Sequence, residues 1–219
     1  ARQYGANVLY PTEVEDLEFE EDRLTAAITN QGRFELDKIV LAGGTDTPIL
    51  AEKVGYEMPL LHNPGLFTHS KPIEPFTNLV ALKTSGLTVK QLQNGIIVAA
   101  ESDAPPEHEQ GVHTVIRQQR LEMPEAIAQE HGNRILSQVA EAFPVSQGAE
   151  LDKVLIGYRP YPRDGMPIVG SLDSAPDVYV ATMHSGVTLA PIIGQYVTRE
   201  LLSDRPVAML EPYRPNRFQ

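Results

Sequence analysis

Apolar and polar residues alternate near the start of the chain in short runs that are typical of β-strands. These runs are Val8 to Tyr10, Glu13 to Phe19, Leu24 to Thr29 and, after a turn at Gln31-Gly32, Arg33 to Leu36. Because successive side chains of a strand point to opposite faces, this alternation places the apolar residues toward a core and the polar residues toward solvent. We therefore predict a small β-meander in this region.

The next segment, DKIVLAGG, breaks the alternation. Four consecutive apolar residues, 39–42, stop at Gly43-Gly44, as expected for a parallel strand buried on both faces. Residues 45–54 predict a short helix with Thr45 or Asp46 as N-cap, and Pro48 is tolerated in its first turn. A strand that leads directly into a helix indicates the α/β class.

The middle of the chain returns to strands separated by turns, with helices set among them. The sequence Gln93-Asn94-Gly95 predicts a hairpin turn, and the Pro-rich stretch 101–111 predicts an exposed loop. Helical spacing covers 112–131 and 133–143, with an interruption at Met123-Pro124, where proline fits the first turn of a new helix. The strands predicted here are Leu66 to His69, Leu79 to Thr84, Leu87 to Leu92, Ile96 to Ala100 and Lys153 to Tyr161.

The end of the chain alternates strand and helix again. A strand is predicted at Val178 to Thr182 and a helix from about Val187 to Leu202. Alternation at both ends around a more sheet-like middle predicts one α/β domain interrupted by an inserted α+β domain. We expect residues 1–54 and 157–219 to form the first domain and residues 55–156 the insertion.

Composition and charge exclude several classes of function. The chain has 219 residues, a formal net charge of -11 and no cysteine. Its lysines and arginines are scattered, so we expect no surface for nucleic acid or for an anionic membrane. The lack of cysteine excludes disulfides and thiolate chemistry and fits a reducing compartment, so the cytoplasm is the expected location. No apolar run approaches the roughly 20 residues that span a bilayer.

The spacing of the histidines does not indicate a metal site. The histidines other than His184 lack the grouped spacing of metal ligands, so we expect no metal site and treat them as surface or structural residues. These five residues are His62, His69, His108, His113 and His131.

The start of the sequence has the pattern of a domain interior. The first residue is Ala1, and the segment GANVLY resembles the middle of a domain, a small-residue turn that leads into a strand. We therefore expect a fragment, a processed chain or one subunit of a split enzyme.

A small-residue turn near the C-terminus has the pattern of an anion site. An apolar strand enters the turn Ser185-Gly186, and a helix begins at once. The first N–H groups of a helix lack partners within it and together carry about half a positive charge, so they favour a ligand oxygen that is or becomes negative. An ordinary strand-turn-helix connection fits the same residues.

Two spaced motifs then resemble a known family. They are GYRPYPRDGMPIVG at 157–170 and VYVATMHSGVTLAPIIGQYVTRELL at 178–202. Together they are similar to the C-terminal flavin-binding signature of the D-amino-acid oxidase, glycine oxidase and sarcosine oxidase family. The upstream order of elements, a meander followed by VLAGG and a helix, is similar too. The resemblance covers nearly the whole chain and implies the C-terminal part of a Rossmann-like FAD-binding domain with an inserted antiparallel-sheet substrate domain.

The resemblance implies a cofactor site built from separate parts of the chain. Val14 stands where the family contacts the adenine of FAD through the backbone. Residues 42–44 stand where the chain passes close to the dinucleotide, and residues 184–188 would pass beside the flavin ring. Thr45 stands where many members have tryptophan, a departure from the family pattern. The implied cofactor-binding residues are Val14, Ala42, Gly43, Gly44, Gly157, His184, Ser185, Gly186, Val187 and Thr188.

The resemblance also implies two candidate catalytic residues, Arg159 and His184. Arg159 matches the family's arginine that pairs with a substrate carboxylate, a task suited to a planar guanidinium. By itself, an arginine between Tyr158 and Pro160 also fits a structural ion pair at a strand end. His184 stands where some members carry a polar group over the substrate. It would either set specificity or cap the strand end.

The sequence lacks two features that bear on how FAD would be bound. The family's G-x-G-x-x-G segment is not in this sequence, so we expect the chain alone to bind FAD weakly or not at all. Without cysteine, the chain has no residue for a cysteinyl flavin linkage, so the FAD is expected to be non-covalent.

The resemblance implies the FAD-dependent oxidation of a small amino acid or secondary amine, such as glycine, sarcosine, a D-amino acid or a proline derivative. The expected partners are this substrate and the missing N-terminal half or a partner subunit. The alternative is a non-catalytic subunit or fragment that folds and associates with another chain without binding FAD alone.

Overall fold

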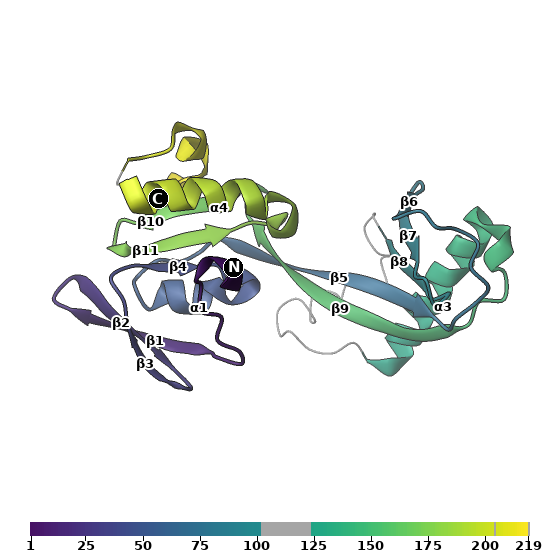
Figure 1. Ribbon diagram of the computed structural model, residues 1–219. Helices are drawn as coiled ribbons and strands as arrows, with labels where there is room; N and C mark the ends of the chain where they lie inside the picture. The colour runs from purple at the N-terminus through teal and green to yellow at the C-terminus, as the bar shows by residue number, and fades with distance from the viewer. Residues whose placement is uncertain (102–123, 204, 219) are drawn as a thin grey trace. The chain divides into compact units, whose positions relative to one another are not determined.

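The computed structural model describes residues 1–101, 124–203 and 205–218 (Figure 1). The chain forms two compact units. The first consists of Ala1–Leu61 and Pro160–Gln219, and the second is His62–Arg159. Within the described residues, none of the helices combines the length and the apolar character needed to cross a membrane.

The first unit contains the predicted β-meander. Strands β1 (Val14–Glu20), β2 (Arg23–Thr29) and β3 (Gly32–Glu35) form an antiparallel sheet in that order. The prediction of a strand at 8–10 is wrong, because those residues have no regular structure and their side chains are about half exposed or more. They precede Pro11, which has no N–H to donate to a neighbouring strand.

The second sheet of this unit joins distant parts of the chain. Strands β10 (Ile168–Leu172) and β11 (Ala175–Thr182) form an antiparallel hairpin, and β4 (Ile39–Leu41) pairs parallel to β11. The predicted parallel strand is confirmed. Its predicted burial on both faces is wrong, since Val40 is 38% exposed whereas Leu41 is buried; β4 also lies at the edge of this sheet within the described residues.

Helices cover both faces of this second sheet (Figure 1). Helix α4 (Gly186–Ser203) lies on one face, and α1 (Thr47–Glu52) lies on the other. The side chains alternate accordingly, because successive residues of a strand point to opposite faces. Val178 and Val180 belong to the core that includes α1 and the meander, whereas Tyr179 packs with Ile193 and Val197 of α4.

The second unit is a five-stranded sheet with a helix packed against it. Its buried core contains Val89 and Ile97 from neighbouring strands and Ile135 and Val139 from the helix. The strand order is β6 (Leu82–Lys83), β7 (Leu87–Gln91), β8 (Ile97–Glu101), β5 (Leu60–Ser70) and β9 (Leu151–Pro162), and the helix is α3 (Glu125–Ala142).

The predicted hairpin turn at 93–95 is confirmed between β7 and β8. Gly95 has φ of 83°, and its N–H donates to the carbonyl of Leu92 over 2.9 Å. The strand predicted at 79–84 is limited to β6, Leu82–Lys83.

The helix prediction in this unit needs a correction. Pro124 is the N-cap of α3, as the interruption at Met123-Pro124 indicated, but no break follows at residue 132. Gly132 instead lets the helix pack closely on β9, since an added Cβ would come within 2.5 Å of the Leu151 side chain. The loop predicted over 101–111 begins one residue later, because Glu101 is the last residue of β8. The rest of that loop and the helix predicted over 112–123 lie outside the described residues.

Candidate functional site

An apolar cavity of about 530 Å³ opens at the start of helix α4. Its wall includes the ends of β4 and β11, the first two turns of α4 and Pro160 at the end of β9. Val40 and Ala42 contribute from the β4 side, and Ala190 and Gly194 contribute small side chains from the helix. The cavity therefore offers a surface that a flat apolar ring can contact.

Strand β11 sets the position of the helix start. Val178 and Val180 are fully buried, so the strand is fixed in the core up to Thr182. The chain then turns through Met183, His184 and Ser185, and the carbonyl of Ser185 accepts a 2.9 Å hydrogen bond from the N–H of Leu189. The N–H groups in the first turn of α4 have no acceptor within the helix, and the helix dipole favours negative charge beside them.

Two buried threonine hydroxyls lie beside this region. Thr182 and Thr47 are each 1% exposed, and neither Oγ1 has a hydrogen-bond partner among the described residues. Thr182 lines the cavity. A buried hydroxyl without a partner costs stability, and the position of Thr182 in the cavity wall leaves its hydroxyl available to a polar group of a bound molecule.

The turn after β4 brings backbone close to the same cavity. Gly44 lines the cavity and has φ of 63°, a conformation that side chains other than glycine rarely adopt. An added Cβ on Gly43 would lie 3.6 Å from the backbone nitrogen of Thr47 and 3.7 Å from its hydroxyl. These are ordinary contact distances, so only Gly44 is required to be glycine by its conformation.

His184 is held by two contacts within the first unit. Its Nδ1 lies 3.2 Å from the Ser185 hydroxyl, and the ring of Tyr161 meets its own in an edge arrangement with centroids 4.9 Å apart. His184 is half-buried and lines the cavity. These contacts restrict the direction of the imidazole ring.

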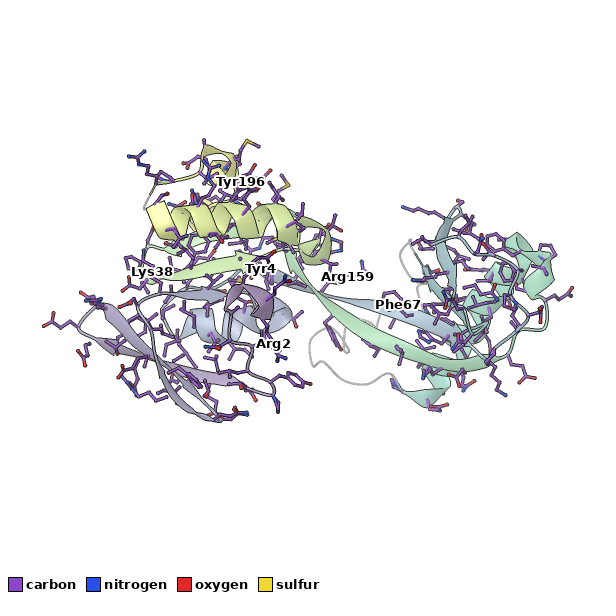
Figure 2. The ribbon with its side chains drawn as sticks, viewed as in Figure 1. Arg2, Tyr4, Lys38, Phe67, Arg159 and Tyr196 are labelled. Atoms are coloured by element: carbon purple, nitrogen blue, oxygen red, sulfur yellow. The ribbon has the colours of Figure 1, made fainter. Side chains whose placement is uncertain are left out.

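Arg159 lies in the second unit, on strand β9. Figure 2 labels it together with Phe67, which comes from β5. The residue is exposed, and its guanidinium lies against Gly65, where an added Cβ would meet Nη2 at 3.1 Å. The side chain is thus supported by the neighbouring strand.

The predicted site residues divide among different places. Ala42, Gly44, His184, Gly186 and Val187 line the cavity. Gly43 lies in the turn after β4, and Ser185 and Thr188 are exposed at the start of α4. Val14 lies on β1 and packs against the core, and Gly157 lies on β9 in the second unit.

The sequence patterns did not identify several other residues of the cavity wall. Thr182, Met183, Pro160 and Gly194 line it as well. One signal was available, since residues 186, 190 and 194 are small and share one face of a helix at a spacing of four. Nothing in the sequence marks Thr182, because its burial depends on the packing of β11.

Other sites among the described residues are less suitable. No group of three or more acidic or histidine side chains that could hold a metal ion occurs in that part of the chain. A second cavity of about 420 Å³ is lined by charged residues of both signs, including Lys38, Asp173 and Glu211. It suits a flat apolar ring less well than the cavity at α4.

The sequence profile of the FAD dependent oxidoreductase (DAO) family matches residues 1–200, and the chain belongs to this family. The D-amino-acid oxidase of Bradyrhizobium diazoefficiens is 24% identical over 201 residues, which are 90% of this chain and 44% of that protein. Sarcosine oxidase subunit beta of an Arthrobacter species is 23% identical over 224 residues, covering 100% of this chain and 51% of that protein.

Solved structures share the fold. The L-amino acid deaminase from Proteus vulgaris, with its specific insertion sequence deleted, matches with a TM-score of 0.75 and 17% identity over 99% of this chain and 52% of that chain. The predicted mixed α/β fold with antiparallel sheets is thereby confirmed. The chain spans about half the length of the curated relatives described above.

The residues around the cavity fit the family's cofactor. The apolar wall suits the flavin ring, the start of α4 suits an oxygen that gains negative charge, and the buried Thr182 hydroxyl lacks a partner among the described residues. Gly44, which has no side chain, brings main chain into the cavity wall.

Proposed function

We propose that this chain supplies the substrate domain and the flavin-ring edge of an FAD-dependent enzyme that oxidises a small amino acid or secondary amine. Candidate substrates are glycine, sarcosine, a D-amino acid and a proline-type amine. The observation that carries the proposal is the apolar cavity at the first turn of α4, with the unsatisfied hydroxyl of Thr182 in its wall. In this proposal FAD is held without a covalent bond.

The proposal divides the roles between the parts of the chain. Residues 1–54 and 157–219 contribute to the FAD-binding domain, and residues 55–156 form the substrate domain. Among the site residues, Ala42, Gly43 and Gly44 face the dinucleotide through their backbone. The N–H groups at 185–188 hold the edge of the ring.

When bound, FAD supplies a two-electron oxidation by accepting a hydride from the substrate carbon next to nitrogen. The N–H groups at the start of α4 would favour negative charge at the edge of a ring bound beside them, and they are already oriented by the helix. His184 adds a polar group whose direction is fixed by Tyr161 and Ser185. If the substrate amine arrives in the neutral form, loss of a hydride from the neighbouring carbon leaves a protonated imine, so this step needs no protein base. The resulting imine is hydrolysed by water.

Arg159 holds the substrate carboxylate in this proposal. Its planar guanidinium donates two parallel hydrogen bonds, which fix the substrate in both distance and orientation. The exposed position of Arg159 on β9 and its support by Gly65 are compatible with this role.

Kinetics of the full-length protein test the proposal. Its visible spectrum is recorded first, and oxidation of the candidate amines is then screened. Arg159→Ala is expected to raise KM by about 100-fold or more, since an arginine-carboxylate pair is lost. Arg163→Ala is the matched control, because Arg163 is an exposed arginine four positions away on the same segment. Flavin-free protein, or equal KM for Arg159→Ala and wild type, would contradict the proposal.

A second candidate function is association without catalysis. The edge of β4 away from β11 has no neighbouring strand within the described residues, and Val187 on α4 is 95% exposed. An open strand edge beside exposed apolar side chains favours pairing with another chain. Sedimentation of this chain tests the idea, and a stable monomer at high concentration would count against it.

A further inference from the structure

Two glycines and two long side chains alternate across the strand pair β5 and β9. A Cβ added to Gly65 on β5 would meet three atoms of the Arg159 guanidinium, with Nη2 at 3.1 Å, Nε at 3.5 Å and Cζ at 3.6 Å. A Cβ added to Gly157 on β9 would instead meet the ring of Phe67, with Cε2 at 3.6 Å. Each glycine thus makes room for a side chain of the other strand.

These strands run antiparallel. The N–H of Lys71, just after β5, donates to the carbonyl of Glu150, just before β9, whereas Gly65 earlier in β5 lies beside Arg159 late in β9. Residues 157 and 159 are two apart and therefore point to the same face of the sheet. Phe67 and the Arg159 guanidinium lie on that face together.

Backbone conformation gives no reason for glycine at residue 65. Its φ is not in the positive range that favours glycine, unlike that of Gly95 or Gly148. Glycine in the interior of a strand weakens the strand, so it commonly marks a place where another group approaches closely. At residue 65 that group is the guanidinium of Arg159.

We infer that Gly65 is a positioning residue that sets where the Arg159 guanidinium meets the substrate carboxylate. This inference rests on the proposed function, in which Arg159 binds the carboxylate. The three guanidinium atoms within 3.6 Å of the Cβ position show that the planar group lies against the bare backbone of residue 65. Residue 65 therefore determines how far the guanidinium group of Arg159 extends from the sheet.

An added methyl group acts on Arg159 more than on the fold. At 3.1 Å the Nη2 atom must move by a few tenths of an ångström, and it is the far end of a flexible side chain. The strand itself can accommodate alanine because its backbone is not strained there. A bidentate pair depends on alignment, so even a small displacement weakens carboxylate binding.

The experiment uses the full-length flavoprotein and two probes of nearly equal shape, benzoate and benzamide. Dissociation constants are measured from the change in flavin absorption on titration. Gly65→Ala is expected to weaken benzoate about five-fold, and the bulkier Gly65→Val about 20-fold or more, with benzamide unchanged. Thr68→Val is the control, since Thr68 lies on the same strand and its side chain is fully buried.

A double variant separates the positioning role from other effects. If residue 65 acts through Arg159, then Gly65→Ala added to Arg159→Ala changes benzoate affinity no further. Additive losses would overturn the inference, as would benzoate affinity in Gly65→Ala equal to wild type. If Gly65→Ala does not fold, the double variant should fold because the contacting guanidinium is gone. Failure of both to fold would also overturn it.

The same titrations distinguish a failure of the proposed function. Equal benzoate affinity in wild type and Arg159→Ala, or no preference of the wild type for benzoate over benzamide, would remove Arg159 from the carboxylate site. A loss in Arg159→Ala with no loss in Gly65→Ala would leave the proposed function intact and reject only the role of Gly65.

Discussion

The hydroxyl of Tyr179 donates a 2.5 Å hydrogen bond to Oε2 of Glu200 and joins strand β11 to helix α4. The same carboxylate accepts two hydrogen bonds from Arg214, at 2.8 and 2.5 Å, and one from the N–H of Val207. The side chain of Glu200 is only 8% exposed and that of Arg214 is 16% exposed. Glu200 therefore attaches the C-terminal segment to the sheet and to the helix that borders the cavity.

Replacement of Glu200 should destabilise the protein much more than replacement of Tyr179. Glu200→Ala leaves the largely buried Arg214 without its partner, and we expect a loss of about 3 kcal/mol in the free energy of unfolding. Tyr179→Phe removes one of four hydrogen bonds and should cost about 1 kcal/mol. Urea denaturation measures both. Glu211→Ala, whose carboxylate is 77% exposed and 3.8 Å from Arg214, is the control and should have little effect. Equal losses in Glu200→Ala and Glu211→Ala would contradict the prediction.

The same network should make stability depend on pH. Burial alone would raise the pKa of Glu200, but the hydrogen bonds from Arg214, Tyr179 and the Val207 amide outweigh it and hold the pKa below its usual value. The unfolded carboxyl titrates at about 4.3, so this contribution is complete above that value and is lost as pH falls through the folded pKa. Denaturation midpoints measured between about pH 7 and pH 3 should therefore fall less steeply in Glu200→Gln than in wild type. Parallel curves would count against this role of Glu200.

Much of the fold follows from local patterns in the sequence. The alternation in residues 24–29 predicted β2, and the uninterrupted apolar run at 39–42 predicted a strand parallel to its neighbour. In both cases the side chains that bury apolar area are close together in sequence, so a short window contains the information.

The errors arise where distant residues determine the outcome. The helix α3 runs through Gly132, where glycine serves close packing against Leu151 rather than the end of the helix, and no local pattern reveals that contact. The edge position of β4 depends on which strands are present beside it. Thr182 looks like an ordinary strand residue, and only the packing around β11 shows that its hydroxyl is buried.

The candidate site was predictable in part for the same reason. The residues at 184–188 form one continuous motif, and a strand-turn-helix pattern is visible in the sequence. The support of Arg159 by Gly65 was not visible, because the two residues meet only through the pairing of β5 and β9.

Gly95→Ala should be strongly destabilising. Gly95 has φ of 83°, and an added Cβ would come within 2.1 Å of the carbonyl oxygen of Ile73, which is backbone and cannot move aside easily. We expect a loss of about 3 kcal/mol or more in the free energy of unfolding. Gly148→Ala is the matched control, because Gly148 has φ of 85° but no atom within 4 Å of the Cβ position. Its cost should be only about 1 kcal/mol from the backbone conformation. Urea denaturation compares the two, and similar losses would show that the contact with Ile73 is unimportant.

Thr182→Val should separate stability from cofactor binding. Valine has nearly the same shape as threonine and removes a buried hydroxyl that has no partner within the described part of the chain. The variant should therefore be more stable than wild type without flavin, by about 1 kcal/mol. If the hydroxyl meets a polar group of FAD, the full-length protein should at the same time lose about ten-fold in FAD affinity, measured by flavin release on dilution.

Thr68→Val is the control that separates the effect of losing any buried threonine hydroxyl from a specific effect on FAD binding. Thr68 is fully buried, its hydroxyl also lacks a partner among the described residues, and it lies on β5 in the second unit. Its replacement should increase stability by a similar amount and leave FAD affinity unchanged. Equal FAD affinity in all three proteins would mean that the Thr182 hydroxyl does not contact the cofactor. A loss of stability in both variants would mean that each hydroxyl has a partner, such as a buried water.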